Sequence, residues 1–261
     1  MARLVKRPRI SQILEFCAEE PIERVFLEDV ARRGLGRFVA LKDGGQLTAV
    51  CHVGANLVPS GVGAAAFAEL AAGGEARMLV GEELAVTELW EAARDRLPEP
   101  LEDRPGQPVY VLDRPPPAGQ TALRAARLGD LDALVAASAA AYREEVGVDA
   151  YARDPALFEW RTRVQIEEGR SWLWRENGRI LFKAEASAWT DRAVQLQQVW
   201  VDPELRGRGF AKRGLADLTR LLLDRTPAVC LFVRPENAPA IALYEGIGMR
   251  RTITYRSLIF G

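Results

Sequence analysis

The sequence predicts an α/β protein of two domains, a mixed sheet with helices on its faces in the C-terminal one and a smaller α/β domain before it. Two observations support this. Apolar runs of strand length alternate with amphipathic segments of helix length along most of the 261 residues. Three successive prolines in the segment Asp113–Gln120 fit neither a helix nor a central strand and favour an extended connector. We place the boundary near Pro117, giving domains of residues 1–117 and 118–261.

The C-terminal domain is predicted to run strand, helix, helix, three strands, helix, strand, helix, strand. Asp130 precedes an Ala-rich amphipathic segment, where a carboxylate favours a helix start, and Asn177-Gly178 is typical of a hairpin turn. The predicted helices are Asp130–Tyr142, Asp154–Glu168, Phe210–Asp224 and Pro239–Ile247. The predicted strands are Thr121–Arg127, Ser171–Arg175, Arg179–Trp189, Val194–Val201, Ala228–Val233 and Arg251–Phe260.

The N-terminal domain is predicted to begin with two helices, Ile10–Glu19 and Ile22–Arg33. Strands Arg37–Leu41 and Gln46–Asn56 follow, then helix Ala64–Ala72, strand Ala76–Val80, helix Val86–Arg96 and strand Pro108–Leu112. From the hairpin onward this is the order of the C-terminal domain with one strand fewer. The segment VPSGVGAAAFAEL also parallels VDPELRGRGFAKRGLADL. We interpret the halves as two copies of one fold, the first degenerate. An unrelated α/β domain is the alternative.

Composition excludes several classes of function. Lys plus Arg total 35 against 36 Asp plus Glu, a balance that argues against binding nucleic acid through phosphate contacts. Three cysteines and one histidine, His52, cannot supply a zinc site or the His-dependent triad of a hydrolase, so no metal is expected. No apolar run reaches the length of a membrane span, and the basic N-terminus has no apolar core behind it. We expect a cytoplasmic protein that binds neither nucleic acid nor membranes, and a homodimer stays open.

The segment from Val199 to Lys212 carries the strongest chemical signal. A β-branched strand ends at Val201, a Gly-containing loop follows, and a helix starts at about Phe210. Backbone amides at such a helix N-terminus bind phosphate groups, and glycines let the backbone approach the anion. A tight turn with no ligand is the alternative for the loop taken alone. The candidate binding residues are Val199, Trp200, Val201, Arg206, Gly207, Arg208, Gly209, Phe210, Ala211 and Lys212.

Two motifs then resemble one family. Arg206-x-x-Gly209-x-Ala211 matches the (Q/R)xxGx(G/A) loop of the GNAT (GCN5-related) N-acetyltransferases. Downstream, Asn237-Ala-Pro-Ala-Ile-Ala-Leu-Tyr-Glu-Gly-Ile-Gly-Met249 is similar to the family's second signature, NxxAxxLYExxG(F/M). The resemblance covers about Thr121–Phe260, and both motifs stand in the family's order. The N-terminal half is similar to the uncharacterised region that precedes some bacterial GNAT domains.

The resemblance implies an N-acetyltransferase that uses acetyl-CoA as co-substrate. Backbone groups of Val199–Val201 would pair with the pantetheine arm, amides from Gly207 to Lys212 would hold the pyrophosphate, and Asn237 would face the cofactor. Tyr244 would act as the general acid for the leaving thiolate. The acceptor, a small-molecule or peptide amine, attacks the thioester directly, so no protein nucleophile is needed.

The general base is harder to assign. A glutamate that some relatives carry corresponds here to Phe232, and the preceding strand offers Gln197 and Gln198, which cannot accept a proton usefully. Glu185 is the best remaining candidate. Its alternative is an ion pair with Lys183, and a base acting through water, or no base, also stays open.

Further carboxylates follow the first C-terminal helix, in Tyr142–Glu145 and in Asp149–Asp154, where they would suit a cationic acceptor or form a solvated loop. In the N-terminal half, Pro59–Ala64 has no arginine before its glycines, so this half is expected to have lost acetyl-CoA. A non-catalytic acyl-CoA sensor is the alternative function. A nucleotide-binding module is weaker, because the loop lacks the GxxxxGK(S/T) spacing.

Overall fold

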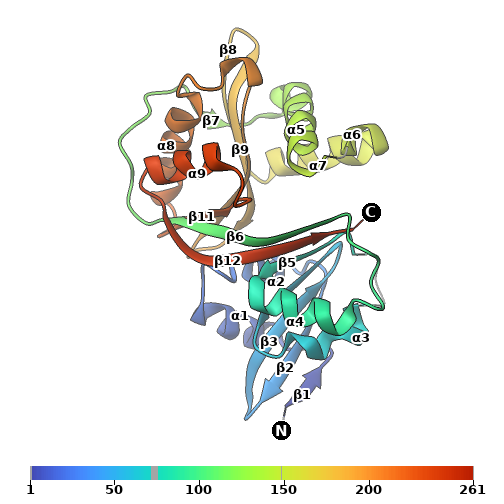
Figure 1. The fold of residues 1–261 in the computed structure, drawn as a ribbon. Coiled ribbons are helices and arrows are strands. Elements are labelled where there is room, and N and C mark those ends of the chain that lie inside the picture. The colour runs from blue at the N-terminus through green and yellow to red at the C-terminus, as the bar shows by residue number, and fades with distance from the viewer. Residues whose placement is uncertain (1, 72–75, 148, 261) are drawn as a thin grey trace.

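A single mixed β-sheet runs through the whole molecule (Figure 1). The computed structural model describes residues 2–71, 76–147 and 149–260. Over these residues the sheet has 12 strands in the order β1-β2-β3-β4-β5-β12-β6-β11-β10-β9-β8-β7. The predicted α/β class is confirmed, and helices cover both faces of the sheet.

The two halves of the chain repeat one order of elements. The N-terminal half comprises β1 (Arg3–Val5), α1 (Ile10–Glu19), α2 (Val25–Arg32), β2 (Arg37–Asp43), β3 (Gln46–Val53), β4 (Asn56–Gly61), a 3₁₀ turn (Ala64–Phe67) leading into α3 (Ala68–Ala71), β5 (Met78–Glu82), α4 (Glu83–Ala93) and β6 (Glu102–Leu112). The C-terminal half comprises β7 (Arg124–Ala125), a 3₁₀ turn (Leu128–Asp130), α5 (Leu131–Val146), α6 (Ala150–Arg153), α7 (Pro155–Glu167), β8 (Ser171–Glu176), β9 (Arg179–Trp189), β10 (Val194–Val201), a 3₁₀ turn (Pro203–Leu205), α8 (Phe210–Leu223), β11 (Val229–Phe232), α9 (Ala238–Gly246) and β12 (Arg250–Ile259).

The last strand of each half lies in the other half's part of the sheet. β6 pairs antiparallel with β11 of the C-terminal half, and β12 pairs antiparallel with β5 of the N-terminal half. The two exchanged strands also pair with each other, and Figure 1 shows them side by side across the middle of the molecule. Each half is therefore completed by a strand from the other.

The predicted single strand Gln46–Asn56 is wrong, because the chain turns at residues 54–55. Val53 on β3 faces Leu57 on β4 across a tight hairpin, which the Gly54 amide closes by donating to the Asn56 carbonyl oxygen at 3.2 Å. The two central residues of the turn, Gly-Ala, are not a dipeptide that strongly signals a hairpin. The additional strand, β4, gives the two halves the same number of strands.

The predicted strand Thr121–Arg127 pairs with β8 only at Arg124 and Ala125. The chain before it is bound to α8 instead. The Asp217 carboxylate accepts hydrogen bonds from the Gly119 amide at 2.6 Å and from the Thr121 amide at 2.8 Å. These bonds satisfy backbone groups that a strand would have paired, so the connector lies along the helix.

Apolar side chains of α8 cover one face of the C-terminal part of the sheet. Leu215, Leu218 and Leu222 recur at helical spacing and are fully buried against β9, β10 and β11. A second core lies beneath α3 and α4 in the N-terminal half and includes Leu258 of β12. The exchanged strand thus contributes to the core of the half that receives it.

Candidate active site

Strands β10 and β11 pair in parallel and then separate. Over the described residues their pairing consists of Val194 with Val229 and Gln195 with Cys230. Beyond Gln195 the two strands diverge, while β11 continues to pair with β6 as far as Phe232. The divergence leaves one backbone edge of β10 without a strand partner. A pantetheine arm that pairs with β10 in the manner of an added strand would need such a free edge.

A bulge in β10 lies where the strands separate. The register against β9 shifts between Gln197 and Trp200, and Gln198 adopts a φ of 49°, which is rare for a residue other than glycine. The Gln198 side chain accepts a hydrogen bond from Lys183 Nζ at 2.7 Å, which holds the bulge. Val199 and Trp200, on the C-terminal side of the bulge, line the cavity described below.

The predicted phosphate loop connects β10 to α8. Gly207 and Gly209 have φ values of 74° and 80°, and Gly209 is the N-cap of α8. A Cβ atom on either glycine would meet no other atom within 4 Å, so this side of the loop faces open space. The first amides of α8 have no partner within the helix, and Arg208 and Lys212 are exposed beside them. The loop thus fits a pyrophosphate group.

Arg206 connects this loop to two neighbouring elements. Its Nε donates to the Val201 carbonyl oxygen at 3.2 Å, and its guanidinium forms an ion pair with Glu144 at the end of α5, at 2.6 Å. Val201 itself is buried in the core, and Phe210 packs against Trp174 with ring centroids 5.1 Å apart.

A cavity of about 1720 Å³ lies beside the separated strands, and both halves of the chain line it. The predicted residues that it brings together are Val199, Trp200, Asn237, Tyr244 and Glu185. Val201 and the loop residues Arg206, Gly207, Arg208, Gly209, Phe210, Ala211 and Lys212 are not among its lining residues. Asn237 has a second role, because its side chain caps α9 by accepting the Ala240 amide at 3.2 Å.

Tyr244 is buried on α9, with the ring 7% exposed, and lines the cavity. Burial, and next the negative charge of Glu145, raise the pKa of its phenol above the ordinary value. The phenol is therefore protonated throughout the physiological pH range and able to donate a hydrogen bond.

Glu185 lies in a buried ion pair. Its carboxylate accepts Lys183 Nζ at 2.5 Å and the Ser138 hydroxyl at 3.1 Å, and Lys183 is fully buried. The contact with Lys183 is the alternative that we raised from the sequence. The Glu185 carboxylate is thus occupied by Lys183 and Ser138 and is not free to meet an acceptor amine.

Glu145 is one of the carboxylates that we expected to suit a cationic acceptor or to form a solvated loop, but the sequence analysis did not consider it as the base. The helix predicted as Asp130–Tyr142 continues to Val146 and ends at Gly147, which adopts a φ of 76°. Glu145 therefore belongs to the last helical turn. Five residues of α5 line the cavity, and four of them recur at helical spacing: Ser138, Ala141, Tyr142 and Glu145, with Glu144 as the fifth. That spacing was visible in the sequence, and the helix end predicted too early concealed it.

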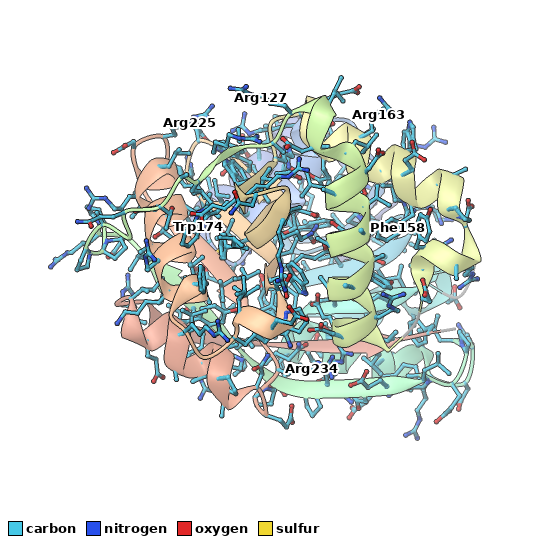
Figure 2. The ribbon with its side chains drawn as sticks, turned by 90° about the horizontal axis from the view of Figure 1, so that it is seen from above. Arg127, Phe158, Arg163, Trp174, Arg225 and Arg234 are labelled. Atoms are coloured by element: carbon cyan, nitrogen blue, oxygen red, sulfur yellow. The ribbon has the colours of Figure 1, made fainter. Side chains whose placement is uncertain are left out.

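The carboxylate of Glu145 accepts no hydrogen bond from the side chains that the structure describes. The residue is exposed at the cavity, but the protein around the carboxyl group removes part of its hydration, and this desolvation raises its pKa. The positive charges of Arg104, Arg234 and Lys183 lower the pKa and so oppose the rise. The backbone carbonyl oxygen of Glu145 accepts hydrogen bonds from Arg104 and Arg234. Figure 2 shows Arg127 near the start of α5 and Arg234 near its other end.

The corresponding sites in the N-terminal half are filled by protein groups. Glu88 on α4 accepts the Gly63 amide at 2.9 Å and the Ala64 amide at 2.8 Å, where the phosphate loop stands in the other half. Where β4 and β5 separate, Arg24 donates to the Ser60 hydroxyl at 3.1 Å. Ser60 in turn donates to Glu82.

The remaining chemistry-bearing residues lie in the core. His52 is buried between Phe26 and Phe38, and desolvation lowers the pKa of its imidazole. Burial raises the pKa of the Cys51 and Cys230 thiols to about 12. In residues 2–71, 76–147 and 149–260, no three His, Cys, Asp or Glu side chains group to hold a metal ion. No helix in these ranges is long and apolar enough to cross a membrane.

Comparison with known families agrees with this geometry. The model of the Acetyltransferase (GNAT) family matches residues 131–249. Residues 131–249 therefore form a domain of the GNAT acetyltransferase family. A domain of unknown function (DUF4081) matches residues 36–134, which include β6. A mycothiol acetyltransferase of Brachybacterium faecium is 39% identical over 72 residues, which are 27% of this chain and 22% of that protein.

Solved structures share the fold over the whole chain. A GCN5-related N-acetyltransferase from Sphaerobacter thermophilus has a TM-score of 0.62 at 20% identity and covers 98% of this chain and 94% of its own. An acetyltransferase of the GNAT family from Colwellia psychrerythraea has a TM-score of 0.58 at 12% identity and covers 100% of both chains. A tandem GNAT protein from the clavulanic acid biosynthesis pathway has a TM-score of 0.57 at 13% identity and covers 100% of this chain and 99% of its own.

Proposed function

We propose that the GNAT domain transfers an acetyl group from acetyl-CoA to a primary amine by direct attack. The observation that carries the proposal is the free edge of β10, which leads from the open phosphate loop to a cavity holding Tyr244. Acetyl-CoA, when bound, supplies an acyl group activated as a thioester. The amides that follow Gly207 and the cations of Arg208 and Lys212 would hold its pyrophosphate.

Two side chains of the cavity suit the proton transfers. The amine nitrogen attacks the thioester carbon, so that a C–N bond forms and the C–S bond breaks. Glu145 accepts the proton that the amine gives up, and Tyr244 donates a hydrogen bond, and finally its proton, to the leaving sulfur. We choose Glu145 because desolvation raises the pKa of its carboxyl group and no described side chain donates to it, whereas the Glu185 carboxylate is occupied by Lys183. Glu185 is the second candidate for the base.

The Glu145 carboxylate in the cavity supports an acceptor that arrives as an ammonium ion. Its lining includes ten carboxylate side chains and six arginines. Several of the arginines are neutralised by carboxylates, as Arg104 is by Glu102 and Arg33 is by Glu168. Four of the carboxylates pair with cations outside the lining, Glu82 with Arg24, Asp103 with Arg256, Glu144 with Arg206 and Glu185 with Lys183, so the site as a whole is close to neutral. Glu145 forms no ion pair in the described part of the chain, and an ammonium group that reached it would gain a charge partner.

Calorimetric titration of acetyl-CoA tests the cofactor, with ATP as the competing ligand. We expect binding at one site, lost in Gly209→Trp because the indole fills the open face of the loop. Gly44→Trp is the matched control. Gly44 also has a positive φ, 56°, and open space around it, but it lies in the β2–β3 hairpin. No binding by the unmodified protein would overturn the proposal.

A panel of primary amines then tests turnover. Acetylation of at least one amine, lost in Glu145→Gln and retained in Glu185→Gln, supports both the reaction and the base. Loss in Glu185→Gln alone would move the base to that residue. Binding of acetyl-CoA with no acetylation of any amine favours instead an acyl-CoA sensor.

A further inference from the structure

We infer that the N-terminal half completes the active site of the GNAT domain: its last strand, β6, which lies within the region of unknown function, positions both Glu145 and Tyr244. This inference rests on the proposed function. The exchanged β6 lies between β12 and β11, so it borders the cavity from a segment that precedes the GNAT domain in sequence. Two of its side chains, Arg104 and Tyr110, carry the argument.

Arg104 binds the end of the helix that carries Glu145. Its guanidinium donates to the Glu145 carbonyl oxygen at 2.8 Å and to the Glu102 carboxylate at 2.5 Å. The Arg104 side chain is only 8% exposed, and Arg234, from the segment after β11, donates to the same carbonyl oxygen. Two arginines from different segments thus hold one helix end.

A helix C-terminus is a position that needs such support. The last carbonyl groups of α5 have no partner within the helix and the terminal turn frays easily, whereas a cationic side chain there satisfies a carbonyl and interacts favourably with the helix dipole. Because Glu145 lies in this turn, the arginines fix where its side chain enters the cavity. Arg104 also opposes the raised pKa of the Glu145 carboxyl group.

Tyr110 supports the other side of the reaction. Its ring lies against that of Tyr244, with centroids 5.8 Å apart, and its hydroxyl donates to Glu245 at 3.0 Å. Glu245 follows Tyr244 on α9, so the contacts fix both the ring and the helix that carries it. Arg104 and Tyr110 are thus positioning residues on one strand, and neither takes part in bond making.

Hydrogen–deuterium exchange tests, without any acceptor, whether Arg104 holds the end of α5. In Arg104→Gln we expect faster exchange in the peptide that spans the last turn of α5, and unchanged exchange in α8. Arg256→Gln is the matched control. Arg256 lies on β12 and forms an ion pair with Asp103 of β6, the neighbour of Arg104, at 2.6 Å, but Arg256 does not line the cavity. Equal exchange in both variants would overturn the inference.

Kinetics with an amine from the acceptor panel test the catalytic consequence. Arg104→Gln should lower kcat/KM ~10- to 100-fold, the cost of a slightly displaced catalytic group, and leave the Kd for acetyl-CoA unchanged. Removal of the cation beside Glu145 should also move the acidic limb of the pH profile to higher pH. Arg104→Lys should restore part of kcat/KM and part of the position of that limb. Tyr110→Phe, which keeps the ring, should lower kcat more mildly.

The outcomes separate this inference from the proposed function. If the unmodified protein binds no acetyl-CoA, the proposed function fails, and hydrogen–deuterium exchange alone decides whether Arg104 holds the end of α5. If it acetylates an amine and Arg104→Gln keeps both its rate and its pH profile, the strand has no positioning role and the inference fails while the function stands.

Discussion

The guanidinium of Arg206 and the carboxylate of Glu144 form an ion pair at 2.6 Å. The pair joins the phosphate loop to the end of α5, next to Glu145. A pyrophosphate that enters the loop competes with Glu144 for the same cation. In the proposed reaction the two ligands would thus meet Glu144 and Glu145, which are adjacent in the chain.

Glu144→Gln should therefore strengthen the binding of acetyl-CoA. The variant frees Arg206 and removes a negative charge beside the phosphate site, and an exposed pair of this kind contributes ~0.2–1 kcal/mol, so we expect a Kd lower by about two- to fivefold. Calorimetry at low and high salt measures the effect, which should shrink at high salt. A weaker affinity would show that Glu144 helps to order the loop.

Tyr244→Phe should lower kcat about 10²-fold and leave the Kd for acetyl-CoA unchanged. The phenol supplies the hydrogen bond to the leaving sulfur, and loss of a general acid costs roughly this factor. Tyr151→Phe, on the exposed face of α6, is the control and should behave as the unmodified protein. Steady-state kinetics with a good acceptor provide the measurement, and equal rates for both variants would refute the acid role.

The pH dependence should reveal Glu145. Because the pKa of its carboxyl group is raised in the folded protein, kcat/KM should fall on acidification along a limb above the ordinary glutamate range, and Glu145→Gln should lack that limb. The raised pKa also means that the charged carboxylate destabilises the fold. As the pH rises through the folded pKa, the unmodified protein should lose stability relative to Glu145→Gln, as chemical denaturation at several pH values would show.

Asp130 should give the opposite dependence on pH. Hydrogen bonds from Arg124, and next from the Arg127 amide, lower the pKa of its carboxyl group from 3.8 to about 2. The resulting stability is present above the unfolded pKa and lost as the pH falls through the folded one. Asp130→Asn should cost ~2 kcal/mol at neutral pH and nearly nothing near pH 2. Asp132→Asn, an exposed neighbour on α5, should show no such change.

Glu88→Gln should destabilise the fold without creating a second cofactor site. Its carboxylate satisfies two backbone amides at a helix N-terminus, and a neutral amide oxygen satisfies them less well, so we expect a loss of ~1–2 kcal/mol. Glu91→Gln, exposed on the same helix, is the control. Titration should still show one acetyl-CoA per chain, and two equivalents would contradict the view that protein groups fill this half.

Most of the local structure could be predicted from the sequence. The limits of α1, β9 and β10 were predicted to the residue, because a hairpin dipeptide before β9 and clear apolar periodicity mark them. The phosphate loop and the helix of Tyr244 were predicted from short motifs. These features depend on residues close together in the chain, where side-chain chemistry determines the backbone directly.

The exchange of β6 and β12 was beyond such reasoning. Periodicity indicates that Pro108–Leu112 is a buried strand, but it does not say which sheet receives it. The same limit concealed the contact between the Glu145 carbonyl oxygen and Arg104, a residue some forty positions earlier in the chain. Contacts between residues so far apart in the chain depend on the topology of the sheet, and the local patterns of a single sequence do not indicate them.

The exchanged strands also determine the order in which the sheet can close during synthesis. β12, which covers the edge of β5, leaves the ribosome after every other described strand and helix. Until then the nascent N-terminal half presents an open edge to other chains, a state prone to misassembly. The N-terminal half therefore reaches its final state only after β12 has been synthesised, and a nascent chain stalled before Arg250 would hold a C-terminal half that β6 can complete beside an N-terminal half without its last strand.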